Sequence, residues 1–151
     1  MILLDSSISA YLEMFKDLNW LHVAVAGIAN FAIGSIWFAP PVFGNAWMKE
    51  LGITKEDAKK VNMVVVMGGA ILMAFVMAIT IGMVTMIYAQ LVMNDAMFAG
   101  MMGAALGGGL IGAQMIMNGL FEMRSFKLIC ITVGHTLVCC IGMTLILLLW
   151  K

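Results

Sequence analysis

The chain has 151 residues, of which 64% are hydrophobic and only 11% are charged, and its formal net charge is zero. Soluble domains carry about a quarter charged residues, so these values argue against a soluble globular domain and against a disordered chain. A neutral chain also lacks the excess of Lys and Arg with which proteins bind nucleic acids. The class that remains is a membrane protein with several spans.

The charged residues fall in clusters and leave four long uncharged runs. Each run is longer than the roughly 20 residues that an α-helix needs to cross the hydrocarbon core. Backbone groups in lipid have to be hydrogen-bonded within the protein, and the alternation typical of barrel strands is absent. We therefore predict an all-α fold, a polytopic bundle of four transmembrane helices with short interfacial helices. The spans are expected near residues 20–39, 63–89, 96–120 and 128–150.

We expect residues 1–19 to form an N-terminal tail and residues 20–151 to form the four-span membrane domain. Ile8, Tyr11, Leu12 and Phe15 recur at helical spacing, which predicts a short amphipathic helix on the membrane surface. No short basic segment precedes the first apolar run, so we expect no signal peptide and expect the first span to remain in the mature protein.

The loop after the first span contains several helix signals. Pro40 is followed by a second proline, and this pair is expected to end the span because proline lacks an amide proton. Residues 42–51 predict a short interfacial helix that Gly52 closes. The segment from Thr54 to Asp57 resembles a capping box, which predicts a helix that runs from Thr54 into the second span without a break.

Glycine is concentrated in the third span, where Gly103 pairs with Gly107 and Gly108 pairs with Gly112 in two GxxxG patterns. Small residues let helix backbones approach closely in lipid. We interpret these glycines as packing positions within the bundle, and a subunit interface remains the alternative. The second span offers a matching series of small residues: Gly68, Gly69, Ala70, Ala74, Ala78 and Gly82.

Three polar residues, Asn30, Gln114 and His135, lie at a similar depth in three different spans. Gln114 and His135 are about 10 Å from the end of their span that faces the first and third loops, at 1.5 Å of rise per residue, and Asn30, nine residues before Ala39, lies at a similar depth. Polar groups that face hydrocarbon are costly, so all three are expected to turn inward. This polar layer is interpreted either as a set of hydrogen bonds that fix helix packing or as a substrate or proton site.

The distribution of Lys and Arg predicts the orientation. The first and third loops carry six basic residues: Lys49, Lys55, Lys59, Lys60, Arg124 and Lys127. The tail, the second loop and the C-terminus carry two: Lys16 and Lys151. We therefore expect the first and third loops in the cytoplasm and both termini outside, with Glu122 and Arg124 anchoring the cytoplasmic turn before the fourth span.

No metal ion or other cofactor is expected. Met73 with Met77, and Met97 with Met101, stand four residues apart, and thioethers bind Cu(I). Methionine is also an ordinary filler of apolar interiors, and no methionine-rich capture segment precedes the spans. The three cysteines between residues 130 and 140 are assigned no role. Motifs such as HExxH and GxSxG are absent from the sequence, so the chain is not expected to be an enzyme.

Two motifs follow one another at the end of the first span. Gly34, Trp37 and Pro40 form a Gly-x-x-Trp-aromatic-x-Pro pattern, and a Phe-Gly-x-x-Trp pattern follows at Phe43, Gly44 and Trp47. Together with later stretches over about residues 19–150, they resemble the small prokaryotic membrane-protein family filed as domain of unknown function 1761. The chain departs from that family's pattern at Phe38 and His135, where tyrosine is more often expected. The resemblance implies four spans in a bacterial inner membrane and implies no activity.

Two functions stay open at this point. The first is a structural or accessory inner-membrane protein of unknown activity, embedded in the lipid bilayer and in one version self-associating as a homo-oligomer. The alternative is a transporter or channel for a small solute or an ion, which uses the polar layer in the inner half of the bundle. A transporter should have this layer open to one side, whereas a structural protein should have it dry and fully hydrogen-bonded.

Overall fold

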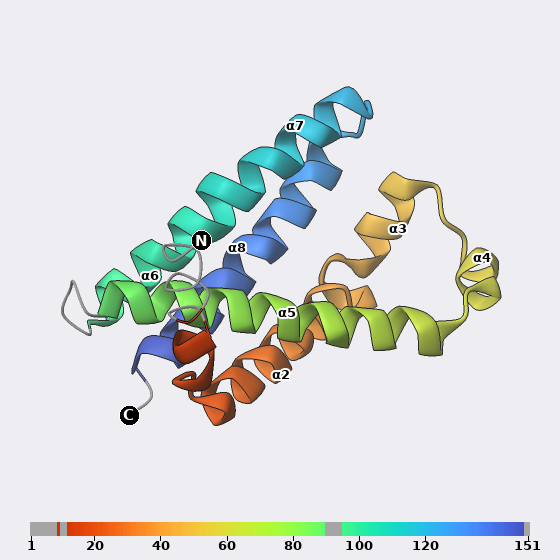
Figure 1. The fold of residues 1–151 in the computed structure, drawn as a ribbon. Coiled ribbons are helices and arrows are strands. Elements are labelled where there is room, and N and C mark those ends of the chain that lie inside the picture. Colours follow the sequence, from red (N-terminus) through yellow and green to blue (C-terminus); the bar gives the residue numbers. More distant parts are fainter. Residues whose placement is uncertain (1–8, 10–11, 90–94, 150–151) are drawn as a thin grey trace.

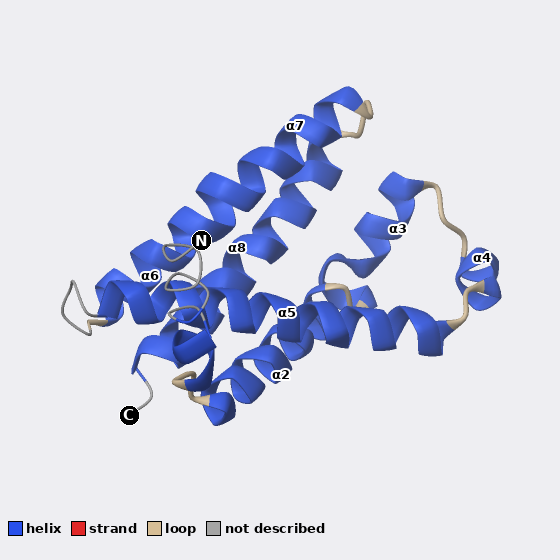
Figure 2. Cartoon of the chain, viewed as in Figure 1, coloured by secondary structure: helices blue, strands red, loops and turns tan. Residues whose placement is uncertain are grey.

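The computed structural model describes residues 9, 12–89 and 95–149, and all regular elements in these ranges are helices (Figures 1 and 2). Four helical segments are long and apolar enough to cross a membrane, which confirms the predicted all-α fold with four spans. They are α2 (Trp20–Trp37), α5 (Met63–Ala89), the continuous series α6 (Ala96–Ala104), η2 (Ala105–Gly112) and α7 (Ala113–Phe121), and α8 (Phe126–Leu149). The predicted boundaries differ from these by no more than two residues. Of the predicted helix in the tail, residues 12–15 are helical, and residues 1–8, 10 and 11 lie outside the described residues.

The helix α8 lies at the centre of the molecule and contacts each of the other spans. On one side α2 packs against both α5 and α8, and on the other side α6, η2 and α7 run along α8 (Figure 1). The main core lies where α2 and α5 meet α8. It contains Leu18, Val23, Ala26, Ala78, Ile81, Cys139, Cys140 and Met143. Residues 63–73 of α5 are exposed throughout, so the start of this helix diverges from the rest of the bundle.

Polar side chains fix where three of the spans begin. Asn19, Asn62 and Asp95 precede α2, α5 and α6, and each accepts a hydrogen bond from the backbone N–H two residues later, at 3.1, 3.1 and 2.6 Å. The first amides of a helix have no partner within it, so a capping side chain stabilises the first turn.

The first span ends at Trp37, just before the proline pair predicted to end it. In the π-helical turn η1 (Pro40–Gly44), the N–H of Gly44 donates to the carbonyl five residues earlier, at 3.0 Å. A Cβ at Gly44 would collide with the carbonyl oxygen of Phe38, so this turn needs a glycine. The helix α3 (Asn45–Leu51) follows and ends at Gly52, which has a φ of 68°. The predicted short helix at residues 42–51 is thus confirmed, with a π-helical turn at its start.

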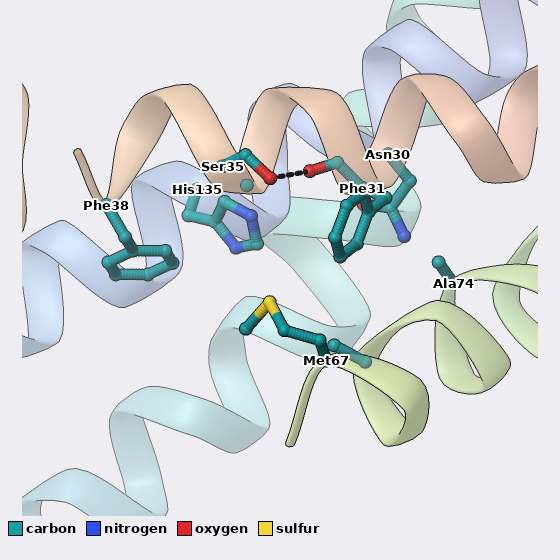
Figure 3. A pocket seen from close by; sticks show the side chains of 9 residues that line it. Asn30, Phe31, Ser35, Phe38, Met67, Ala74 and His135 are labelled. Carbon is teal, nitrogen blue, oxygen red and sulfur yellow. Dashed lines mark hydrogen bonds between the residues drawn. The ribbon is translucent and has the colours of Figure 1, made fainter. Parts of the chain in front are cut away.

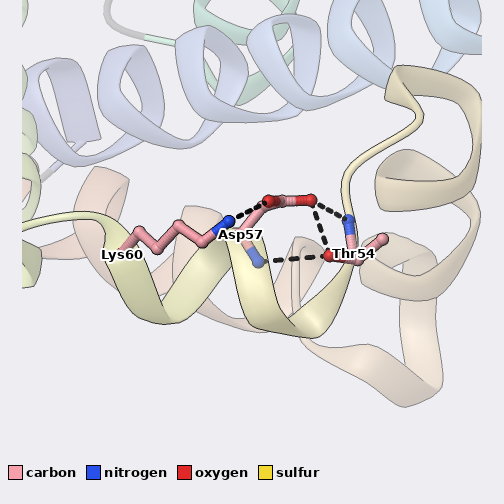
Figure 4. A network of polar contacts seen from close by, with 3 residues as sticks. All are labelled: Thr54, Asp57 and Lys60. Carbon is pink, nitrogen blue, oxygen red and sulfur yellow. Dashed lines mark hydrogen bonds and ion pairs between the residues drawn. The ribbon is translucent and has the colours of Figure 1, made fainter.

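The predicted capping box is confirmed at the start of α4 (Lys55–Lys60) (Figure 4). The Thr54 hydroxyl accepts from the N–H of Asp57, and the carboxylate of Asp57 accepts from the N–H of Thr54, both at 3.2 Å. The Thr54 hydroxyl also donates to the Asp57 carboxylate, and this bond, followed by those from Lys60 and from the N–H of Thr54, lowers the pKa of Asp57. The prediction of an unbroken helix into the second span is wrong, because the backbone is extended at Val61 and Asn62 caps a new helix.

The predicted packing glycines of the third span, Gly103, Gly107, Gly108 and Gly112, all lie against α8. At Gly103 a Cβ would be only 2.5 Å from the Cα of Ile141, so the two backbones touch at this point. The series of small residues in the second span is not their partner, since its buried members pack against α2 and α8 instead.

A π-helical segment, η2, interrupts the third span where the sequence suggests a plain α-helix. It contains four glycines, and the absence of side chains at these positions leaves room for the wider π-helical turns. A Cβ at Gly112 would lie 2.8 Å from the carbonyl oxygen of Gly107, five residues earlier. Segments of this kind are rare in helices and are frequent at functional positions.

Candidate functional site

A cavity of about 470 Å³ lies between α2, α5 and α8 (Figure 3). Most of its wall is apolar, with a few polar side chains from α2 and α8. The lining residues are Asn30, Phe31, Gly34, Ser35, Phe38, Met67, Ala70, Ala74 and His135. The divergence of α5 from the bundle makes this space possible, because Met67 and Ala70 lie in the exposed first part of that helix.

Asn30 is the most informative residue of the cavity, because it is only 8% exposed and its side-chain amide has no hydrogen-bond partner among the described residues. In Figure 3 the amide nitrogen points away from α2 and toward the side of the cavity formed by α5. No fully enclosed polar side-chain atom in the described part of the chain lacks a partner, so this amide is open to the cavity. Buried amides are normally paired, which makes the free amide of Asn30 a candidate contact for a ligand.

His135 projects into the same cavity from α8 (Figure 3). Its Nε2 atom is 3.3 Å from the Sγ atom of Cys139, one helical turn further along. That thiol lies 3.9 Å from the backbone carbonyl of Asn30, to which it donates. The imidazole fits against α2 because residue 34 is glycine, where a Cβ would be 3.1 Å from Nε2. A chain of contacts therefore links His135 to Asn30 through Cys139.

The aromatic residues at the end of α2 hold this region together. The indole N–H of Trp37 donates to the carbonyl of Ile131 on α8, at 3.1 Å. The same ring lies 4.6 Å from the ring of Phe43, measured between centroids, and close to Gly134, where a Cβ would be 3.2 Å from its Cζ2 atom. These contacts fix the position of η1 against α8.

The next aromatic residue, Phe38, closes one end of the cavity. Its ring centroid is 5.0 Å from that of His135 and 5.4 Å from that of Trp47 on α3. The two positions at which the chain departs from the family pattern, Phe38 and His135, are thus in contact. Of the motif residues, only Gly34 lines the cavity. Trp37 contacts Phe43, Trp47 contacts Phe38, and Pro40 and Gly44 belong to the π-helical turn η1.

A polar link outside the spans joins α3 to the start of α8. The Ser125 hydroxyl donates to the carboxylate of Glu50 at 2.6 Å and accepts from the N–H of Leu128, so it also caps α8. Lys127 forms an ion pair with Glu50 at 3.6 Å. The hydrogen bond from Ser125, followed by the charge of Lys127, lowers the pKa of Glu50. Sequence reasoning missed Glu50, because its partner is 75 residues away and no local pattern connects them.

The predicted residues of the cytoplasmic turn, Glu122 and Arg124, form an ion pair with each other, and both side chains are exposed. Met123 between them adopts a left-handed conformation with a φ of 54°. The turn is therefore held locally, and its link to the rest of the molecule runs through Ser125 and not through this pair.

The structure brings together two residues of the predicted polar layer and separates the third. Asn30 and His135 line the same cavity, whereas Gln114 is exposed on α7 and donates to Asn118 at 3.0 Å. The expectation that all three turn inward is wrong for Gln114. The third span buries its glycines against α8, and this contact turns Gln114 to the outside.

The arrangement suits a small ligand that is mostly apolar and carries a hydrogen-bonding group. Such sites are concave, apolar over most of their wall, and contain a few polar groups that orient the ligand. Within the described ranges no cluster of three or more His, Cys, Asp or Glu residues is positioned to hold a metal ion.

Comparison with known families gives a match to the family described as "Protein of unknown function (DUF1761)", over residues 21–148. The match covers most of the chain, so the chain belongs to this family. No curated protein and no solved structure matches it.

Proposed function

We propose that this member of the DUF1761 family is a multi-pass membrane protein that binds a small, largely apolar solute in the cavity between α2, α5 and α8, as a carrier does. The observation that carries the proposal is the amide of Asn30, a residue that is only 8% exposed. This amide lacks a partner among the described residues and opens to the cavity that His135 also lines. A purely structural layer of polar residues should satisfy its own hydrogen bonds. The free amide therefore favours a binding site over a packing role.

The exposed first part of α5 supports a route by which a solute enters the cavity from the bilayer. Residues 63–73 of α5 are exposed, and a Cβ at Gly68 or Gly69 would meet no atom within 4 Å. The cavity wall formed by Met67 and Ala70 thus belongs to a helix segment that has lipid beside it. A solute that partitions into the membrane would reach the site by this side.

We further propose that the first and third loops face the cytoplasm of a bacterial inner membrane. The six-to-two bias of Lys and Arg supports this orientation. Glu56 on α4 is exposed and provides a labelling position. With Cys130 replaced by alanine, Glu56→Cys should react with a membrane-impermeant maleimide only after the cytoplasmic side is opened. Reaction in intact cells would reverse the orientation.

Two matched probes test the binding proposal. 2-Naphthol and naphthalene have the same ring system, but only the first carries a hydroxyl group. In lipid nanodiscs the protein should bind 2-naphthol about 2 to 12 times more tightly, which is the value of one hydrogen bond. Asn30→Leu should remove this preference, whereas Gln114→Leu, at similar depth but outside the cavity, should preserve it. Equal affinity for the two probes in the unmodified protein would contradict the proposal.

A further inference from the structure

The third span presents an outward surface that does not contact α8. We call this surface the amide face and define it as Ala113, Gln114, Met117, Asn118 and Phe121, all of which lie on α7 and are exposed. Phe121 is 85% exposed. The opposite side of the span carries the glycines that touch α8, so intramolecular packing leaves the amide face uncovered.

The depth of the amide face makes its polar groups unusual. Gln114 lies seven residues before the end of the span at Phe121, about 10 Å along the helix axis. Lipid chains at this depth offer no hydrogen-bond partner. The bond from Gln114 to Asn118 uses one N–H and one carbonyl, and the other amide groups of the two side chains have no partner among the described residues. A membrane helix does not gain from carrying the free amide groups of Gln114 toward lipid at this depth.

The same side of the helix also permits close approach by another backbone. A Cβ at Gly109 would meet no atom within 4 Å, and Ala113 follows four residues later with an exposed methyl group. Small residues at this spacing are common where two membrane helices meet. The amides and the small residues are independent features, and both are suited to a second helix.

We infer that the amide face is the contact between two copies of this chain. A carboxamide contains both donors and an acceptor, so a face built on Gln and Asn is complementary to itself. Two copies inserted with the same topology are related by a twofold axis along the membrane normal, so each Gln114 meets the Gln114 of the second copy. This interface differs from the one that the GxxxG pairs suggest, because those glycines are occupied by α8. It also does not depend on the cavity, which is formed by other helices.

Cross-linking distinguishes this face from its neighbour. Met117 and Ile116 are adjacent and are 48% and 41% exposed, but only Met117 belongs to the amide face, and Ile116 borders an apolar groove beside α8. In a Cys130→Ala background, where the remaining cysteines are buried, we expect Met117→Cys to form disulfide-linked dimers in membranes under mild oxidation. The yield of disulfide-linked dimer from Ile116→Cys should be at least five times lower. Equal yields, or more dimer from Ile116→Cys, would overturn the inference.

The strength of association provides a second measurement. Hydrogen bonds between membrane helices change association about 3-fold on average and up to about 20-fold. The double variant Gln114→Leu and Asn118→Leu should therefore dissociate 3 to 20 times more readily, as measured by energy transfer between labelled copies in vesicles. Thr80→Leu on α5 is the matched control, because Thr80 is exposed and bonds its own helix at the Val76 carbonyl. Association that is unchanged in the double variant, or equally weakened in the control, would refute the dimer contact.

Discussion

The two sides of α8 show two different ways of packing apolar helices. On the side of α6 and η2, glycines bring the backbones into contact, and the Thr144 hydroxyl donates across the interface to the carbonyl of Ala99 at 2.9 Å. On the side of α2, large aromatic rings and an indole hydrogen bond hold the helices, and a cavity of about 470 Å³ remains. Small residues thus bring the backbones of α6 and η2 into contact with α8, whereas the rings that meet at the end of α2 leave space beside them.

The largest expected effect is on the glycine side. In Gly103→Leu, the first carbon of the new side chain would already be 2.5 Å from the Cα of Ile141. We expect a loss of about 3 kcal/mol in the free energy of unfolding, the upper range for overpacking. Unfolding in detergent by denaturant measures this. Gly100→Leu, on the same helix but with no atom within 4 Å, is the control and should change little.

An intermediate effect is expected for the aromatic anchor on the other side. Trp37→Phe removes the hydrogen bond to Ile131 and part of the ring that contacts Phe43, so the free energy of unfolding should fall by about 2 kcal/mol. The same unfolding experiment applies. Trp20 is exposed and lies at the other end of α2, so Trp20→Phe should lower the free energy of unfolding by less than half of this amount. Equal losses would show that the indole bond has no special role.

Added volume in the cavity should have a small effect on stability. Ala70 lines the space and is exposed, so Ala70→Leu should change the free energy of unfolding by about 0.5 kcal/mol or less. The affinity for 2-naphthol should fall severalfold, because the leucine side chain occupies part of the cavity in which 2-naphthol binds. A variant that is as destabilised as Gly103→Leu would mean that the cavity side is as tightly packed as the glycine side.

The smallest effect is expected for the link between α3 and α8, and it depends on pH. The pKa of Glu50 is lowered in the folded protein, so its link contributes stability above the ordinary pKa of glutamate, about 4.3. The contribution should disappear as the pH falls through the lowered value. The difference in unfolding between the unmodified protein and Glu50→Gln should be present at pH 6 and shrink below about pH 4. Ser125→Ala should show the same trend, and a difference that grows in acid would contradict the link.

Much of the fold follows from features that are local in the sequence. The four spans are predictable because charged residues are excluded from hydrocarbon, and the capping box at Thr54 is predictable because its partner is three residues away. The break at Asn62 could have been predicted by the same reasoning, since asparagine is a strong helix cap.

The candidate site depends on contacts that are distant in the sequence. The depth of Asn30 and His135 is predictable from helical rise, but their shared cavity depends on how α2, α5 and α8 cross. Depth alone does not determine direction, and Gln114 shows this, because the glycines beside it select which side of the span meets α8. The bond between Ser125 and Glu50 joins two loops and has no local signal.

The π-helical segment η2 has a consequence for the rotation of α7 about its own axis. Each turn with i→i+5 hydrogen bonds contains about one residue more than an α-helical turn. A residue removed from the segment Ala105–Gly112 would therefore be absorbed by a return to α-helix with little change in the direction of later residues. If the segment became α-helical with all its residues kept, every later residue of the span would turn by about 100° relative to α6. The direction in which Gln114 points is thus determined by the π-helical winding of a stretch that has no polar side chain of its own.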